Sequence, residues 1–314
     1  RIGDDPEEQH SLSTKSASLN GDNKNLSSLG RPNSTAWRWT LLPCGLLVGV
    51  ILYASALFAF APLQFGSPVD KYAELKNRAK EIHEESKVLM VQFLSAGYLP
   101  LTKSWICNVR KFPRVLKQTL FVASDEESYN MLRSFGKPHG INVIYVPYPA
   151  MKKEMAFGSY EYYDYMLFRT SMIVELLEAD LTTMIIESDA VWTQDPTDVV
   201  MQTPGDIVGL NDQEPPHQQL CGGFQLIRPT KKSKVAWKKL RTKQEEAMVK
   251  CVGKIKEDHL CGNEQLMMNK LLNNEMEGFQ LTFLKDTEFA SGLFYDDPDE
   301  YMEDENTLPM VIHN

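Results

Sequence analysis

Two carboxylates separated by one residue, Glu187 and Asp189, follow an apolar run in the segment MIIESDAVW. In an extended chain, residues two apart point to the same side, so both carboxylates can face one cleft. Hard oxygen ligands at the end of a strand suit Mg²⁺ or Mn²⁺ carrying a diphosphate, since the metal bridges phosphates and keeps open positions. Two solvated carboxylates at a strand end are also common, so the pair alone indicates a metal site only weakly.

Other polar and small residues beside apolar runs are candidates for the same chemistry, and each has a structural alternative. Arg169 lies in a mostly apolar segment, where it can contact a phosphate or pair with an acid such as Glu187. Asp212 follows a further apolar run and can bind hydroxyl groups of a ligand or cap a turn. Gly222 and Gly223 let the backbone approach a ligand closely, or form a plain turn before the run FQLI.

The elements that must position these residues are short apolar runs that alternate with helical stretches. Runs of strand length and composition cover residues 88–94, 118–124, 141–147 and 182–192. Asp125 is placed to cap the helix DEESYNMLRSF, and residues 160–179 form a long amphipathic helix. This alternation predicts a Rossmann-like α/β domain with a mostly parallel sheet flanked by helices. Ligands of such sheets bind at the carboxyl ends of the strands.

Composition narrows the possible partners and cofactors. The 314 residues are 43% hydrophobic and 24% charged, which is ordinary for a globular protein. The net charge of −9 disfavours nucleic acid as a partner, because binding phosphates requires a basic surface. The five cysteines form no C-x-x-C pair, which disfavours a zinc site, and a Cys251–Cys261 bridge is an option in an oxidising compartment.

An uncharged stretch at residues 40–63 predicts a transmembrane signal anchor. As a helix it is about 36 Å long, enough to cross a hydrocarbon core of about 30 Å. The polar residues 1–36 are expected to be a disordered cytosolic tail, residues 64–86 a charged stem, and residues 87–314 the globular domain. Lysines and arginines flank both ends of the span, and two glycosylation sequons precede it, so the flanking sequence leaves the topology open.

The ordered string of motifs in residues 87–314 resembles glycosyltransferase family 77, whose members carry a nucleotide-diphospho-sugar transferase domain. As in that family, the E-x-D of residues 187–189 is followed by an aromatic residue and an Asp-Pro pair, here Trp192 and Asp195-Pro196. The further similar segments are MLFRT at 166–170, CGGF at 221–224, RPT at 228–230, NEQL at 263–266 and VIHN at 311–314.

The resemblance implies a retaining glycosyltransferase of type A fold that moves a sugar from a nucleoside-diphosphate donor, such as a UDP-sugar, to a hydroxyl of a glycan or glycoprotein. It implies Mn²⁺ or Mg²⁺ held by Asp189 and His313, with Glu187 at the donor ribose or at a metal-bound water. Family members act in the lumenal secretory pathway, so a single-pass type II protein of the Golgi membrane is expected. The expected catalytic residues are Asp189, Gln265 and Asp212, and the expected donor-binding residues are Glu187, Ser95, Gly97, Tyr98, Arg169, Gly222, Gly223 and Asn263.

Two positions depart from the family pattern, because Glu187 and Glu264 stand where the family usually has Asp. An extra methylene moves a carboxylate by roughly an ångström, enough to weaken a contact that depends on geometry. A catalytically silent membrane protein that keeps the fold to bind glycans or partners is therefore an alternative. The clustered acids by themselves also allow a metal-dependent phosphohydrolase.

Overall fold

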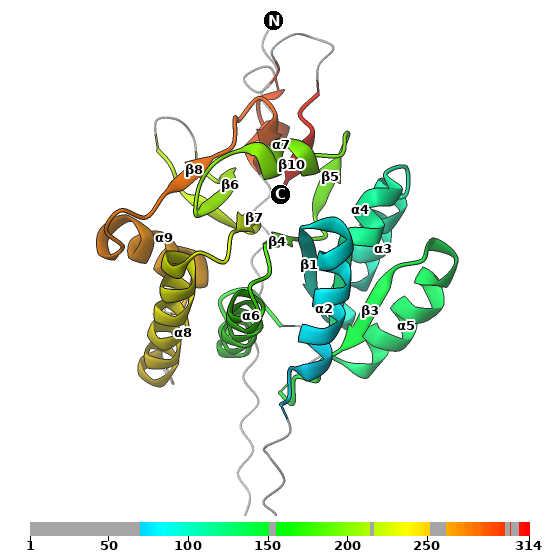
Figure 1. Ribbon diagram of the computed structural model, residues 1–314, viewed down its shortest axis with the longest axis horizontal. Coiled ribbons are helices and arrows are strands. Elements are labelled where there is room, and N and C mark those ends of the chain that lie inside the picture. Colours follow the sequence, from blue (N-terminus) through cyan, green and yellow to red (C-terminus); the bar gives the residue numbers. More distant parts are fainter. Residues whose placement is uncertain (1–69, 151–154, 214–216, 252–261, 299–301, 303–307) are drawn as a thin grey trace, which may run out of the picture. The chain divides into compact units, whose positions relative to one another are not determined.

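The computed structural model describes residues 70–150, 155–213, 217–251, 262–298, 302 and 308–314. Within these residues a seven-stranded sheet has the order β3-β2-β1-β4-β7-β6-β8 (Figure 1). Its strands are β1 (Leu89–Leu94), β2 (Thr119–Ala123), β3 (Asn142–Tyr145), β4 (Thr183–Ile186), β6 (Ile207–Asn211), β7 (Leu220–Ile227) and β8 (Leu281–Phe283). Neighbouring strands are parallel except where β7 pairs antiparallel with β4 and with β6. The prediction of a mostly parallel sheet is confirmed.

Helices cover both faces of this sheet. Successive residues of β1 point to opposite faces, so Leu89 and Val91 join one apolar cluster and Met90 and Leu94 join the other. The first cluster packs under α2 (Ala73–Ser86), α6 (Tyr160–Glu178), α8 (Lys231–Cys251) and α9 (Glu264–Glu275). The second packs under α3 (Leu99–Val109), α4 (Pro113–Gln118), α5 (Glu126–Gly136) and α7 (Thr197–Gln202). The part of the chain that the structure describes also contains the short 3₁₀ helices η1 (Ala96–Tyr98), η2 (Lys137–His139) and η3 (Gly292–Tyr295).

Capping side chains define where α5 and α6 begin. The Asp125 carboxylate accepts a hydrogen bond from the Ser128 N–H at 2.8 Å, which confirms the predicted cap of α5. Its second oxygen accepts from the Ala96 N–H at 2.8 Å, so one carboxylate ties together the ends of β1 and β2. The Ser159 hydroxyl accepts from the Tyr162 N–H and begins α6 in the same way.

The run at residues 182–192 contains two strands, and Glu187 and Asp189 follow the first of them, as the sequence predicts. β4 ends at Ile186, and the chain turns through Glu187, Ser188 and Asp189 before β5 (Ala190–Trp192) begins. β5 leaves the central sheet and joins a second sheet with the order β5-β10-β9, which includes β9 (Phe289–Ala290) and β10 (Val311–His313). The break therefore places both carboxylates between two sheets.

The charged segment at residues 64–86 was expected to be a stem apart from the domain, but its described part packs on the domain. In α2, Leu75, Ala79 and Ile82 are buried and belong to the apolar cluster that includes Leu89. Their spacing of three and four residues places them on one helix face, while the charged residues lie on the other. The globular unit therefore begins before α2 and not at Lys87.

Several predictions fall on parts of the chain that are not described. The tail at residues 1–36 and the anchor at residues 40–63 lie outside the described residues, where no statement about their structure is made. None of the described helices has the length and apolar character that crossing a membrane requires. Cys251 is disulfide-bonded, whereas Cys107 and Cys221 are free; Cys261, the expected partner of Cys251, is also outside the described residues.

Candidate active site

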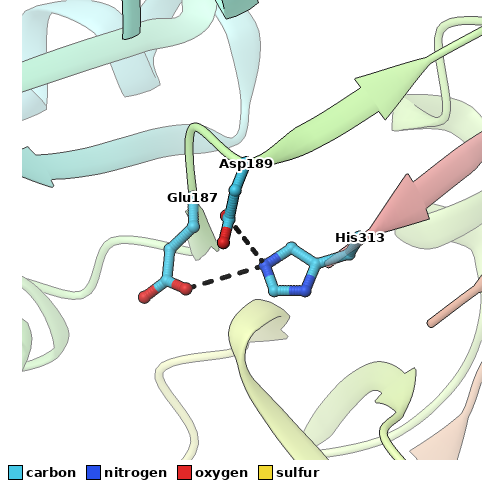
Figure 2. Close-up of side chains that lie close together, drawn as sticks. All are labelled: Glu187, Asp189 and His313. Carbon is cyan, nitrogen blue, oxygen red and sulfur yellow. Dashed lines mark ion pairs between the residues drawn. The ribbon is translucent and has the colours of Figure 1, made fainter. Parts of the chain in front are cut away.

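The turn between β4 and β5 and the last strand together form a cluster of three polar side chains. Figure 2 shows Glu187 and Asp189 on the turn facing His313 on β10. The antiparallel register places His313 opposite Ala190, the residue next to Asp189. The His313 Nε2 atom lies 3.5 Å from Asp189 Oδ1 and 3.6 Å from Glu187 Oε2. The fold thus places Asp189 and His313, which are 124 positions apart in the sequence, next to each other.

Two buried atoms of this cluster lack hydrogen-bond partners among the described residues. They are His313 Nε2 and Asp189 Oδ1, and only 4% of the His313 residue surface is exposed. These are ligands of a divalent cation such as Mn²⁺, which takes carboxylate oxygen and imidazole nitrogen at about 2.1 Å with neighbouring ligands about 3 Å apart. One ligand atom from each of the three residues can be chosen so that all lie within 4.8 Å of one another. The cluster therefore fits a divalent ion after small side-chain movements.

Gly223 on β7 leaves the space that this cluster needs. A Cβ atom at position 223 would lie 2.3 Å from Glu187 Oε2 and 2.5 Å from His313 Nε2. Both distances are far below ordinary contact, so any larger residue here would displace the two side chains. The requirement for glycine comes from this close approach of the β7 backbone to the cluster.

The charges of the cluster are mutually dependent. Burial acts to raise the pKa of Glu187, but the His313 and Arg169 side chains lower it, and the resulting pKa is about 2. Burial raises the pKa of Asp189, and the neighbouring Glu187 carboxylate raises it further, although His313 opposes both. Burial acts to lower the pKa of His313, but Cys221 and Glu187 raise it well above its ordinary value. The pKa values of the two acids are thus shifted in opposite directions, downward for Glu187 and upward for Asp189.

Arg169 on α6 links Glu187 to the start of α9. Its guanidinium donates to Glu187 Oε1 at 2.5 Å and to Glu264 Oε2 at 2.7 Å. Arg169 and Glu264 are both buried, and burial acts to lower the pKa of Arg169 while Glu264 and Glu187 raise it, with a net rise that keeps the arginine charged. The pairing with an acid that the sequence allowed is therefore present, and the two glutamates that depart from the family pattern bind the same guanidinium.

A second hydrogen-bonded unit lies beside the first. The Gly222 N–H donates to Gln265 Oε1 at 2.9 Å, and the Gln265 amide donates to Asp212 Oδ2 at 2.7 Å. Both ends of the Gln265 side chain are held, so its orientation is fixed. The structure therefore joins the backbone of β7, the first turn of α9 and the loop after β6 through one amide.

Both units line a cavity of about 600 Å³, large enough for a nucleotide-sugar. Aromatic side chains form its other wall. Of these, only Tyr98 was a candidate from the sequence. The aromatic lining residues are Phe93, Tyr98, Phe157, Tyr162, Tyr163 and Tyr165. The tyrosine-rich start of the helix, YEYYDY at 160–165, was the available signal, because four tyrosines in six residues exceed what a helix core needs.

Two candidate donor-binding residues, Ser95 and Asn263, have structural contacts. Ser95 and Gly97 are not among the residues that line the cavity; the Ser95 carbonyl accepts from the Tyr98 N–H at 3.0 Å, so this turn sets the position of Tyr98. Asn263 lines the cavity, but its side-chain oxygen accepts from the Leu266 N–H at 2.9 Å and caps α9. The other candidate residues all line the cavity: Tyr98, Arg169, Glu187, Asp189, Asp212, Gly222, Gly223, Gln265 and His313.

Comparison with known families agrees with this arrangement. Residues 114–314 match the nucleotide-diphospho-sugar transferase family. The chain belongs to this family. The resemblance stated from the motifs is confirmed, and the chain is a nucleotide-sugar glycosyltransferase with a mixed α/β glycosyltransferase fold.

Curated relatives come from Arabidopsis thaliana. UDP-D-xylose:L-fucose alpha-1,3-D-xylosyltransferase 1 is 24% identical over 304 residues, which cover 87% of this chain and 80% of the relative. UDP-D-xylose:L-fucose alpha-1,3-D-xylosyltransferase MGP4 is 24% identical over 295 residues, which cover 87% of this chain and 78% of the relative.

Solved structures of glycosyltransferases are also similar to this chain. The glycosyltransferase GlyE of Streptococcus pneumoniae has a TM-score of 0.46 at 16% identity over 72% of this chain, which spans about half (53%) of the GlyE chain. The galactosyltransferase LgtC, with donor and acceptor sugar analogues, has a TM-score of 0.41 at 15% identity, covering 71% of this chain and 86% of that one.

Proposed function

We propose that this chain is a retaining, divalent-metal-dependent glycosyltransferase that moves a sugar from a UDP donor to a hydroxyl of a glycan or glycoprotein. The observation that carries the metal dependence is the convergence of Asp189 Oδ1 and His313 Nε2, two buried atoms without hydrogen-bond partners in the described part of the chain. UDP-xylose is the first donor to test and an L-fucoside the first acceptor, because the curated relatives carry these substrates in their names.

Asp189 and His313 would hold the ion directly, with Glu187 in a supporting position because Arg169 already binds one of its oxygens. Mn²⁺ or Mg²⁺ neutralises charge on the diphosphate leaving group when it is bound. The charge of the buried Arg169 is neutralised by its ion pairs with Glu187 and Glu264, so it is not available to bind a phosphate. We therefore assign Arg169 to holding these two acids in place.

In the proposed reaction, the bond between the donor C1 and the diphosphate oxygen breaks, and the acceptor oxygen bonds to C1 from the same face. The acceptor proton passes to the departing diphosphate oxygen, so atoms and charge balance without a covalent enzyme intermediate. The unit of Gly222, Gln265 and Asp212 is proposed to orient the donor sugar, because its amide is fixed at both ends and lies along the same cavity as Asp189.

We further propose that the domain faces the Golgi lumen behind a type II anchor at residues 40–63. The uncharged span supports the anchor, and the disulfide-bonded Cys251 supports an oxidising compartment. Protease added to sealed Golgi vesicles should leave the domain intact and trim only residues 1–36. Digestion of the domain with the tail protected would reverse this topology.

A transfer assay with a panel of nucleotide sugars tests the proposed activity. Purified protein with UDP-xylose, an L-fucoside and Mn²⁺ should give a glycoside whose anomeric configuration, read by NMR, matches that of the donor, and EDTA should stop the reaction. Inversion would refute the retaining mechanism, and full activity in EDTA would refute the metal. A silent glycan-binding protein would give no transfer with any donor, and a phosphohydrolase would release phosphate from nucleotides without forming a glycoside.

A further inference from the structure

Cys221 on β7 is a buried thiol directly behind the histidine of the candidate metal cluster. Only 2% of its surface is exposed, and its Sγ atom lies 3.6 Å from His313 Nδ1. The Gly223 N–H also donates to this sulfur at 3.3 Å. Because a backbone N–H can only donate, the sulfur is already an acceptor for one neighbour and lies within hydrogen-bond reach of a second.

The two ring nitrogens of His313 face different surroundings. Nδ1 faces the Cys221 sulfur, whereas Nε2 faces Asp189 Oδ1 and Glu187 Oε2. A neutral imidazole carries one proton, and the nitrogen that carries it cannot bind a metal. A proton on Nδ1 can be donated to the sulfur, which leaves the Nε2 lone pair directed at the two acids. A proton on Nε2 would point at the two acids, 3.5 and 3.6 Å away, and would take the place of the cation.

We propose that Cys221 is a positioning residue that keeps the His313 proton on Nδ1 and turns Nε2 toward Asp189 and Glu187. This inference rests on the proposed function only in requiring that the cluster binds a divalent cation. Groups that hold a metal-ligating histidine through its other nitrogen typically change metal affinity by about 10- to 100-fold when removed. An N–H···S hydrogen bond is weak, so the effect of Cys221 belongs at the lower end, about tenfold.

Two substitutions separate this role from simple packing. Cys221→Val fills similar space without an acceptor, whereas Cys221→Ser keeps an acceptor but is smaller. We expect Mn²⁺ affinity, measured by electron paramagnetic resonance of free Mn²⁺, to fall about tenfold in Cys221→Val and by less in Cys221→Ser. A packing role reverses this order, because the valine fills the core and the serine leaves a gap. Cys107→Ser, at an exposed free cysteine, is the matched control and should bind Mn²⁺ like the unaltered protein.

A second background and a metal-free measurement complete the test. In a His313→Gln background, Cys221→Val should cause no further loss of Mn²⁺ affinity; a further tenfold loss there would overturn the proposal. Nitrogen-15 NMR of the neutral His313 ring at alkaline pH, without metal, should show the proton on Nδ1 in the unaltered protein. A proton on Nε2 would also overturn the proposal. Absence of Mn²⁺ binding by the unaltered protein would refute the proposed metal site, whereas binding that is unchanged in Cys221→Val would refute only the role of Cys221.

Discussion

Gly223→Ala is the perturbation whose consequence can be worked out most directly from the structure. The added Cβ would lie 2.3 Å from Glu187 Oε2 and 2.5 Å from His313 Nε2, about 1 Å closer than ordinary contact at each atom. Glu187 cannot rotate away freely, because Arg169 holds its other oxygen at 2.5 Å. The backbone itself tolerates alanine, since Gly223 is not among the glycines with left-handed φ. Misplacing reacting groups by about 1 Å costs roughly 100-fold in rate, about 2.7 kcal/mol of transition-state stabilisation.

The assay measures kcat and Mn²⁺ affinity for Gly223→Ala beside Gly222→Ala. At position 222 the nearest side-chain atom, Gln265 Oε1, lies 3.3 Å from the added Cβ. The Gly222→Ala variant should therefore lose much less activity than Gly223→Ala. Thermal unfolding should show that both variants fold. A Gly223→Ala protein that binds Mn²⁺ and turns over like the unaltered protein would mean that Glu187 and His313 do not converge beside β7.

Three further predictions concern the supports of the site. Arg169→Met leaves the buried Glu264 without its cationic partner and should lower the free energy of unfolding by about 3–5 kcal/mol in urea titrations; a loss under 1 kcal/mol would contradict the buried pair. Leu75→Ala, at a residue with 0% exposure, should cost about 2–5 kcal/mol, and a chain that begins at Lys87 should unfold more easily than one that includes α2; no difference would make α2 a stem after all. The pKa of Glu187 is about 2 in the folded chain against 4.5 ordinarily, so its stabilisation is complete above pH 4.5 and is lost as the pH falls toward 2. Glu187→Gln should therefore reduce the dependence of the free energy of unfolding on pH between 2 and 4.5, measured without metal. An unchanged pH dependence in this variant would show that it does not come from Glu187.

Local patterns in the sequence predict much of the fold, because the relevant forces act between near neighbours. The strands at residues 89–94 and 119–123 lie inside the apolar runs, and Asp125 caps α5 as its spacing predicts. The charged composition of residues 64–86 hid a buried stripe, because Leu75, Ala79 and Ile82 are few in number although they share one face. The low apolar content of this segment predicted a stem, although three apolar residues on one helix face are enough for packing.

Long-range pairing is the part of the site that spacing cannot predict. Nothing local to β10 indicates that it pairs with β5, so the approach of His313 to Asp189 was expected only from the family resemblance. The shared contact of Glu187 and Glu264 with Arg169 likewise depends on how α6 and α9 pack. A buried arginine could be paired with an acid on general grounds, but the identity of the second acid requires the tertiary structure.

Titration calorimetry of UDP with and without Mn²⁺ tests the central claim most directly, in the unaltered protein, in Asp189→Ala and in the matched control Asp198→Ala. Asp198 is an exposed aspartate whose only described ion pair is with Arg114 on the surface. If Asp189 and His313 hold a cation that the diphosphate shares, Mn²⁺ and UDP should each tighten the binding of the other by the same factor. This coupling should be present in the unaltered protein and in Asp198→Ala and absent from Asp189→Ala. Equal UDP affinity in the unaltered protein and Asp189→Ala at saturating Mn²⁺ would contradict the assignment of the site.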